Sequence, residues 1–101
     1  MITVIASIKV VPDKVVEFVN LFNQNVANVL AEDGCIEYYP TVDIETGLDV
    51  QQVDPSVVTI IECWDSVDAL KCHLEAPHMV HYRDQTKDFV QEVRIKVLQS
   101  V

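Results

Sequence analysis

The residues best suited to chemistry gather in one stretch, "ECWDSVDALKCHLEAPHMVHY", which runs from Glu62 to Tyr82. It holds the only tryptophan, all three histidines and two of the three cysteines of the chain. Histidine is the side chain whose ordinary pKa lies closest to neutrality, so a histidine here could serve as a general acid or base. Tryptophan and cysteine are equally typical of a hydrophobic core. The stretch is therefore either a functional site or part of the core.

His73 is the first candidate for a catalytic residue. It follows Leu70 by one helical turn and stands beside Leu74, at the edge of an expected apolar stripe. A histidine in this place is either a hydrogen-bonded core residue or a general base at a cavity. Both interpretations stay open at this point.

Glu62 and Trp64 alternate along the strand-like segment "VVTIIECW" and share a face with Val58 and Ile60. Trp64 either lines a pocket or packs in the core. A carboxylate among apolar neighbours needs a partner, for which we expect Arg83, Arg94 or a tyrosine hydroxyl, or else has a raised pKa. Glu62 is thus a candidate substrate-binding residue or a satisfied buried acid, including one half of an ion pair at a dimer interface.

Two tyrosines complete the candidate substrate-binding set. Tyr38 and Tyr39 are neighbours in a strand and point to opposite faces, so only one of them can enter a given pocket. Tyr82 follows His78 by four residues and His81 by one, and we expect it to share a helical face with them. We take Tyr38 and Tyr82 as candidates to contact a substrate.

A metal site is not expected from the histidines. His78 and His81 could both contact one ion, but two imidazoles fall short of a complete set of ligands. The break expected at Pro77 separates them from His73. We expect both to be more exposed than His73 and to lie at the rim of any cavity, and we expect no cofactor.

The elements that must position these residues follow from alternating periodicities. Strands are expected over residues 2–11, 35–44, 57–64 and 90–98. A five-turn amphipathic helix should start at Lys14 and end at Gly34, and a second, capped by Asp65 or Ser66, should bury Val67, Leu70 and Leu74. A short third helix should run from Pro77 toward Lys87. Residues 45–56 are expected to form a loop or a loosely paired hairpin extension, and Pro40 marks an edge strand or a bulge.

The order βαββαβ predicts a single α+β domain over residues 1–101, with a ferredoxin-like, four-stranded antiparallel sheet and helices on one face. The strands at residues 2–11 and 57–64 look apolar on both faces. A second copy of the chain would cover the open face most simply, so we expect a homodimer in which sheet faces sheet, a dimeric α+β barrel.

Composition excludes several classes of partner. Seven basic and sixteen acidic side chains give a net charge of −9, which disfavours nucleic acid and anionic membranes. No apolar run reaches the length of about 20 residues that a membrane-spanning helix needs, and the start lacks signal-peptide features, so a cytoplasmic protein is expected. Three cysteines without C-x-x-C spacing indicate reduced thiols rather than a disulfide framework or a zinc site.

The segments "IKVVPDKVVEFVNLF", "AEDGCIEYYP" and "IIECWDSVDALKCHLEAPHM" resemble the antibiotic biosynthesis monooxygenase (ABM) domain family, which includes quinol monooxygenases. The resemblance spans nearly the whole chain. It implies a ferredoxin-like dimer with a pocket between helices and sheet in each subunit, in which a tryptophan matching Trp64 lines the pocket. Some members oxygenate phenols or quinols without metal or flavin, while others isomerise signalling sugars, bind haem or have no known activity.

Haem-degrading relatives use an asparagine in the first strand and an iron-ligating histidine in the second helical region. The best matches here are Ala6 and Arg83, which cannot play those parts, although His81 stands nearby. Haem degradation is therefore disfavoured.

Three function classes remain. The first is a cofactor-free monooxygenase of a quinol or related electron-rich aromatic, in which His73 removes a phenolic proton, molecular oxygen reacts with the anion, and Trp64 and Tyr38 pack the ring. The second is an isomerase or tautomerase of a small carbonyl compound, which needs the same base but no oxygen. The third is a non-catalytic dimeric binding module.

Overall fold

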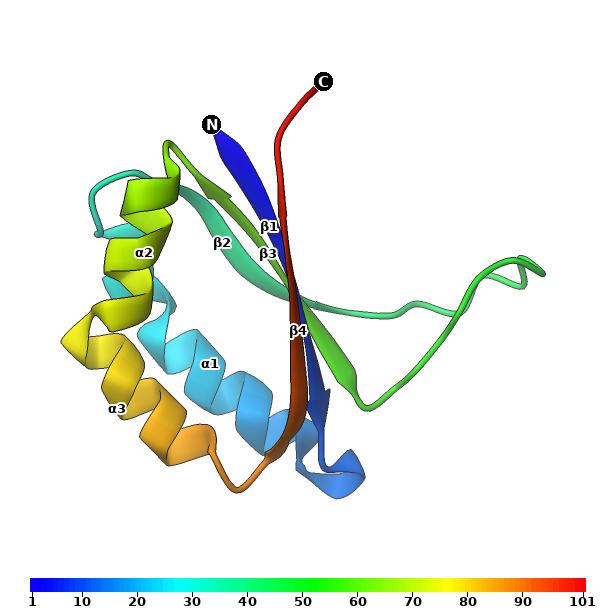
Figure 1. Cartoon of the computed structure of the whole chain (residues 1–101). Helices are drawn as coiled ribbons and strands as arrows, with labels where there is room; N and C mark the ends of the chain where they lie inside the picture. Colours follow the sequence, from blue (N-terminus) through cyan, green and yellow to red (C-terminus); the bar gives the residue numbers. More distant parts are fainter.

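The computed structural model describes residues 1–101 and confirms the ferredoxin-like order of elements. In chain order the elements are β1 (Ile2–Val10), the short 3-10 helix η1 (Pro12–Lys14), α1 (Val15–Leu30), β2 (Cys35–Val42), β3 (Val57–Trp64), α2 (Val67–Glu75), α3 (Pro77–Thr86) and β4 (Val90–Leu98). The three α-helices lie on one side of the sheet (Figure 1). The second helical connection is thus split in two, as the proline at residue 77 predicts.

The antiparallel sheet has the strand order β2-β3-β1-β4. Alternate residues of β1, from Ile2 to Val10, are buried under the helices, while the residues between them are only half-buried. The prediction that β1 is buried on most of both faces is therefore wrong for the single chain. Its outer face mixes Ile5 with polar side chains such as Thr3 and Ser7, as expected for an antiparallel sheet covered on one side.

A β-bulge in β2 changes the predicted faces of that strand. Cys35 pairs with Trp64 and Glu37 pairs with Cys63, so Ile36 is the extra residue. Cys35 consequently packs on the helix-facing side with Tyr38 rather than on the outer side, and Ile36 is half-exposed. Pro40 was predicted to mark an edge strand or a bulge, and the first alternative is confirmed, because β2 is an edge of the sheet.

The ends of the helices depend on local capping. Ser66 caps α2, with its hydroxyl accepting the backbone N–H of Ala69 at 3.1 Å, and Pro77 occupies the first turn of α3, both as predicted. The helix α1 ends at Leu30, and its C-cap is Ala31, three residues before the predicted cap Gly34. Gly34 instead forms the turn before β2, with φ at +84°.

The burial of α2 also differs from the prediction. Leu70 and His73 are buried, whereas Val67 is exposed and Leu74 is partly exposed beside the cavity described below. Val67 lies in the first turn of the helix, where the chain has only just left the sheet.

Two regions are poorly covered by the rest of the chain. The loop 43–56 projects away from the body of the molecule (Figure 1). Along β4, the side chains of Val93, Ile95 and Val97 point to the helix side of the sheet but remain about half-exposed, because no helix reaches over this strand. No helix has the length and apolar character needed to cross a membrane.

Candidate active site

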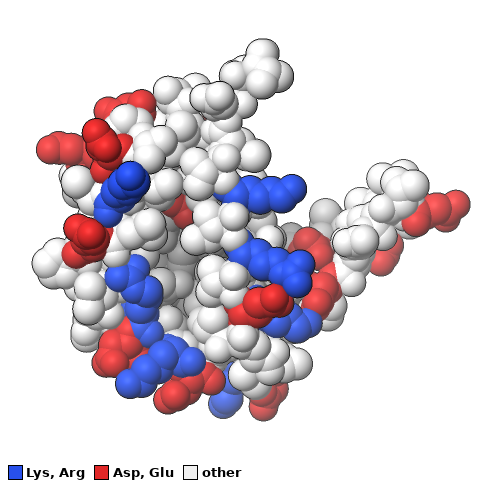
Figure 2. Space-filling model, viewed as in Figure 1, with Lys and Arg blue, Asp and Glu red and all other residues white.

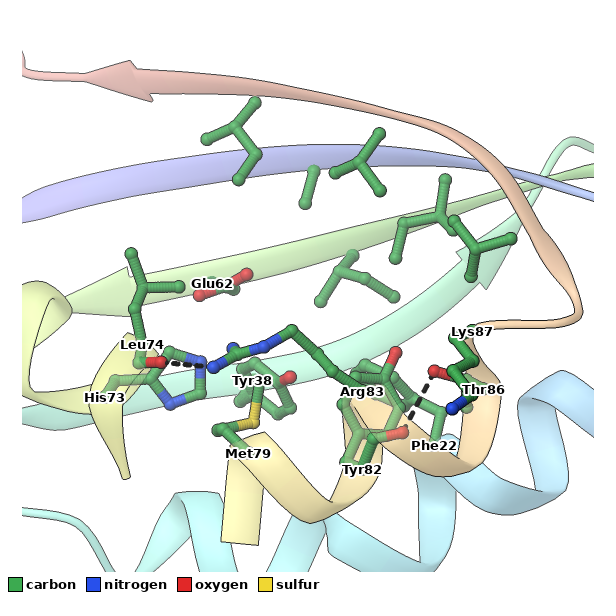
Figure 3. Close-up of a pocket in the computed structure, with 16 residues that line it drawn as sticks. Phe22, Tyr38, Glu62, His73, Leu74, Met79, Tyr82, Arg83, Thr86 and Lys87 are labelled. Atoms are coloured by element: carbon green, nitrogen blue, oxygen red, sulfur yellow. Dashed lines mark hydrogen bonds between the residues drawn. The ribbon is translucent and has the colours of Figure 1, made fainter. Parts of the chain in front are cut away.

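A cavity of about 380 Å³ lies between the helices and the sheet. Every helix and strand except η1 contributes to its wall. The lining residues are Ala6, Ile8, Phe22, Tyr38, Ile60, Glu62, His73, Leu74, Met79, Tyr82, Arg83, Thr86, Lys87, Val90, Val93 and Ile95 (Figure 3). Eleven of these sixteen side chains are hydrophobic. A mostly apolar cavity with a few converging polar groups is typical of a small-molecule site.

Aromatic rings form one wall of the cavity. Phe22 and Tyr38 stack with centroids 5.1 Å apart, and the ring of Tyr82 meets Phe22 edge-on at 5.8 Å. Tyr38 is buried at 5 % exposure while Tyr39 is 46 % exposed on the opposite face, so only Tyr38 enters the cavity. Burial raises the pKa of both cavity tyrosines far above the ordinary value, which keeps their hydroxyls protonated.

His73 lines the cavity and is only 1 % exposed, deeper than the stripe-edge position expected from sequence. Its Nδ1 atom lies 2.7 Å from Oε2 of Glu32. Burial lowers the pKa of His73, and the neighbouring Glu32 carboxylate opposes this shift only in part, so the imidazole is neutral near pH 7. Since a carboxylate only accepts hydrogen bonds, Nδ1 carries the proton, and Nε2 has no hydrogen-bond partner within the chain.

Glu62 lies on the sheet side of the same cavity and is held by Trp64. The indole N–H of Trp64 donates to Oε1 of Glu62 at 2.9 Å. Burial nevertheless raises the pKa of Glu62, because this one hydrogen bond opposes the loss of water only partly. The partners expected from sequence were wrong, since Arg94 points to the outer face of the sheet and Arg83 donates to the backbone oxygen of Leu74 at 2.7 Å.

Trp64 is fully buried and stands behind the cavity rather than in its wall. Its ring centroid lies 4.6 Å from that of His73, and its N–H is bonded to Glu62. The structure therefore brings together four of the five candidate residues at the cavity surface, with Trp64 supporting two of them.

The other two histidines lie outside the cavity. His78 and His81 line a shallow groove between α1 and α3, together with Asn25 and Asn28. The side chain of His78 is 24 % exposed and that of His81 is exposed, both more than His73, as predicted. Nε2 of His78 does approach Oε2 of Glu32 at 3.3 Å, but the geometry is not that of a hydrogen bond. No group of three or more His, Cys, Asp or Glu side chains is arranged to hold a metal ion.

Sequence reasoning missed Glu32, and it considered Arg83 only as a partner for Glu62. Glu32 lies 41 residues from His73 in a polar turn, and no periodicity could connect the two. Arg83 and Lys87 both line the cavity. Figure 2 shows a hollow between the helices and β4 with Lys and Arg side chains on both flanks and Asp and Glu side chains beside them. Lys87, for example, pairs with Asp84 at 3.1 Å.

The fold, the cavity and the sequence place this chain in one family. Residues 1–85 match the family described as Antibiotic biosynthesis monooxygenase, and the chain belongs to this family. A relative from Escherichia coli, named "Probable quinol monooxygenase YgiN", is 38 % identical over 101 residues, which cover 98 % of this chain and 97 % of the relative.

Solved structures agree with this assignment. A conserved protein from Methanosarcina mazei superposes with a TM-score of 0.85 at 27 % identity, covering 99 % of this chain and 92 % of the other. Rv0793 from Mycobacterium tuberculosis superposes with a TM-score of 0.81 at 26 % identity, covering 99 % of this chain and 94 % of the other.

Proposed function

We propose that the protein is a cofactor-independent monooxygenase that acts on a quinol or a related electron-rich aromatic compound. The observation that carries this proposal is His73, a buried neutral histidine with an unpartnered Nε2 in the wall of an apolar, aromatic-lined cavity. Membership of the family and similarity to a relative named as a quinol monooxygenase support the same reaction. His73 is the catalytic base, and Tyr38, Tyr82 and Glu62 contact the substrate.

The reaction begins with proton removal. Nε2 of His73 accepts the phenolic proton, and the positive charge of Arg83 at the cavity wall stabilises the resulting anion. The anion passes one electron to O2, and the two radicals combine to form a carbon–oxygen bond. The peroxide anion formed in this way takes back the proton held by His73. The resulting hydroperoxide loses water, so one oxygen atom stays in the product as a carbonyl and the other leaves as water. Two hydrogen atoms leave the substrate in that water.

The cavity suits this chemistry physically. Its volume lies within the range of about 300–1,000 Å³ that is usual for small-molecule sites. The stacked rings of Phe22 and Tyr38 offer a flat apolar surface to an aromatic substrate. Burial of the base strengthens its interactions and limits access of water to the reactive anion.

The test is oxygen consumption with a menadiol-like quinol, compared among three histidine variants. His73→Asn should lower kcat by about 10²–10⁴-fold, the usual contribution of a general base. His78→Asn and His81→Asn should change it little, because neither residue lines the cavity. Urea unfolding of each variant checks stability. A His73→Asn enzyme of full activity, or one inactive only because it unfolds, would contradict the assignment of the base.

An isomerase or tautomerase is the second candidate. Glu62, whose raised pKa favours the protonated carboxyl, shares the cavity with the neutral base His73, and an acid and a base in one cavity are what keto–enol transfer requires. Turnover of a carbonyl compound without oxygen uptake would favour this reaction. Function that survives His73→Asn unchanged would instead favour a binding module.

We also propose that the functional unit is a homodimer with sheet facing sheet. The outer face of the sheet carries Ile5, Tyr39 and Ile61 together with polar residues, and none of them is covered by a helix. Apolar side chains along β4 add to the uncovered surface. A second copy on the outer face would remove Ile5, Tyr39 and Ile61 from water.

A further inference from the structure

Glu32 is the side chain that forms a hydrogen bond with the proposed base. Its Oε2 atom lies 2.7 Å from Nδ1 of His73, and the two side chains are 16 % and 2 % exposed. A contact between a carboxylate and an imidazole at this distance and burial is a strong, oriented hydrogen bond. It joins the turn after α1 to the last turn of α2 across 41 residues of sequence.

The backbone holds Glu32 in position from both sides. Its N–H donates to the carbonyl of Val29 at 3.0 Å, and its own carbonyl accepts the N–H of Cys35 at 3.2 Å. Two residues after Glu32, the carbonyl of Gly34 accepts the N–H of Asp65 at 2.9 Å. This bond ties the turn to the start of α2. The carboxylate is thus presented to His73 by a turn that is fixed to both neighbouring elements.

This arrangement decides which ring nitrogen can act as a base. A neutral imidazole carries one proton, and only the nitrogen without it has a free lone pair. Because Glu32 can only accept, it keeps the proton on Nδ1 and leaves the lone pair on Nε2. Without an acceptor at Nδ1, nothing in the chain would favour this tautomer, because Nε2 has no partner of its own.

We propose that Glu32 is a positioning residue for the reaction, which fixes the Nδ1–H tautomer of His73 and stabilises the imidazolium that forms when Nε2 takes the substrate proton. The proposal deepens the proposed function, and it rests on His73 being the base. Glu32 itself does not line the cavity. His78, which approaches the same oxygen without a hydrogen bond, is not needed for this role.

The direct test is the tautomer of His73 in the ligand-free, full-length protein, observed by two-bond ¹H–¹⁵N correlation NMR near pH 7. The wild-type ring should be neutral with the proton on Nδ1. Glu32→Ala removes the acceptor, so the His73 signals should shift toward a mixture of tautomers. The amide spectrum of the same samples reports whether the fold is kept, so this readout needs neither substrate nor turnover.

Kinetics supply the second readout. Glu32→Gln should lower kcat on a menadiol-like quinol by about 10²-fold or more with KM changed less than about threefold, as when a carboxylate that orients a catalytic histidine becomes an amide. Glu32→Asp, which keeps the charge, should recover part of the loss. Asp33→Asn is the matched control, since it removes the neighbouring exposed carboxylate of the same turn and should leave kcat unchanged.

Three results would overturn the proposal: a wild-type His73 with its proton on Nε2, an unchanged tautomer in Glu32→Ala, or a Glu32→Gln enzyme with the kcat of the wild type. Full activity of His73→Asn would instead refute the base itself. The two failures are therefore distinguishable.

Discussion

The two carboxylates near the cavity have different roles because they have different neighbours. Glu32 faces a histidine, so its negative charge has a partner that can become positive. Glu62 faces apolar side chains and one indole N–H, and burial therefore favours its protonated form. A protonated carboxyl can donate a hydrogen bond to a substrate oxygen, which an ionised one cannot.

The state of Glu62 predicts a pH dependence of stability. Its folded-state pKa is raised, so its contribution to the free energy of unfolding is complete below the ordinary value of 4.5 and is lost as the pH rises through the folded-state pKa. Glu62→Gln keeps the shape of the protonated form but has no proton to lose. The free energy of unfolding of Glu62→Gln minus that of the wild type should therefore increase as the pH rises above the ordinary value of 4.5.

Urea unfolding at a series of pH values measures this difference. Glu17→Gln is the matched control, because it makes the same substitution at an exposed position on α1, and the increase should be larger for Glu62→Gln than for this variant. A flat difference for Glu62→Gln would show that Glu62 ionises as easily in the folded chain as in the unfolded one.

At the scale of elements, the turn between α1 and β2 has to fit closely against the start of α2. A Cβ atom on Gly34 would lie 2.5 Å from Oδ1 of Asp65 and 2.7 Å from Cβ of Ala69. Gly34 also has a φ of +84°, which side chains with a Cβ rarely adopt. The close fit brings Glu32, two residues earlier, within reach of His73 on α2.

This fit predicts different costs for two glycine substitutions. Gly47 has a φ of +76°, but a Cβ atom on Gly47 would meet no other atom within 4 Å, so Gly47→Ala should cost only the backbone strain, about 1–2 kcal/mol. Gly34→Ala should cost about 1–3 kcal/mol more, because the new methyl group must also displace its neighbours. Urea unfolding of both variants measures the difference. Equal losses would mean that the contact between the turn and α2 relaxes freely.

At the scale of the whole molecule, the apolar surface and the charge are unevenly placed. Acidic residues outnumber basic ones by sixteen to seven over the chain, yet Arg83 and Lys87 line the cavity. This arrangement favours a substrate that becomes an anion during the reaction. Apolar side chains stay exposed on the helix side of β4 and on the outer face of the sheet, and the proposed partner subunit would cover those of the outer face.

The proposed homodimer predicts a mass of twice 11.4 kDa by light scattering at micromolar concentration. Ile61 pairs with Ile5 and Tyr39 near the middle of the outer face, so Ile61→Lys should shift the protein toward the monomer. Val80→Lys, at an exposed position on α3, is the control and should leave the dimer intact. A monomeric wild type would refute the dimer. If Val97→Lys is monomeric and Ile61→Lys is still a dimer, the interface lies on the helix side of β4 instead.

The sequence by itself determined the order and type of the elements, because periodicity, capping and proline act over a few neighbouring residues. Alternation defined β3, Ser66 started α2, and Pro77 separated α2 from α3. The opening stretch also marked the site, since Glu62, His73 and Tyr82 all reach the cavity. The family resemblance then reduced the number of possible reactions, because local patterns in the sequence do not specify a reaction.

Only the tertiary structure decided which side chains meet. The bulge in β2 turned Cys35 to the helix side, the indole of Trp64 became the partner of Glu62, and Glu32 reached His73. Each of these contacts depends on the register of strands or on the packing of a helix against a distant turn. Such placement results from the packing of the whole chain, so no window of the sequence contains the information that pairs Glu32 with His73.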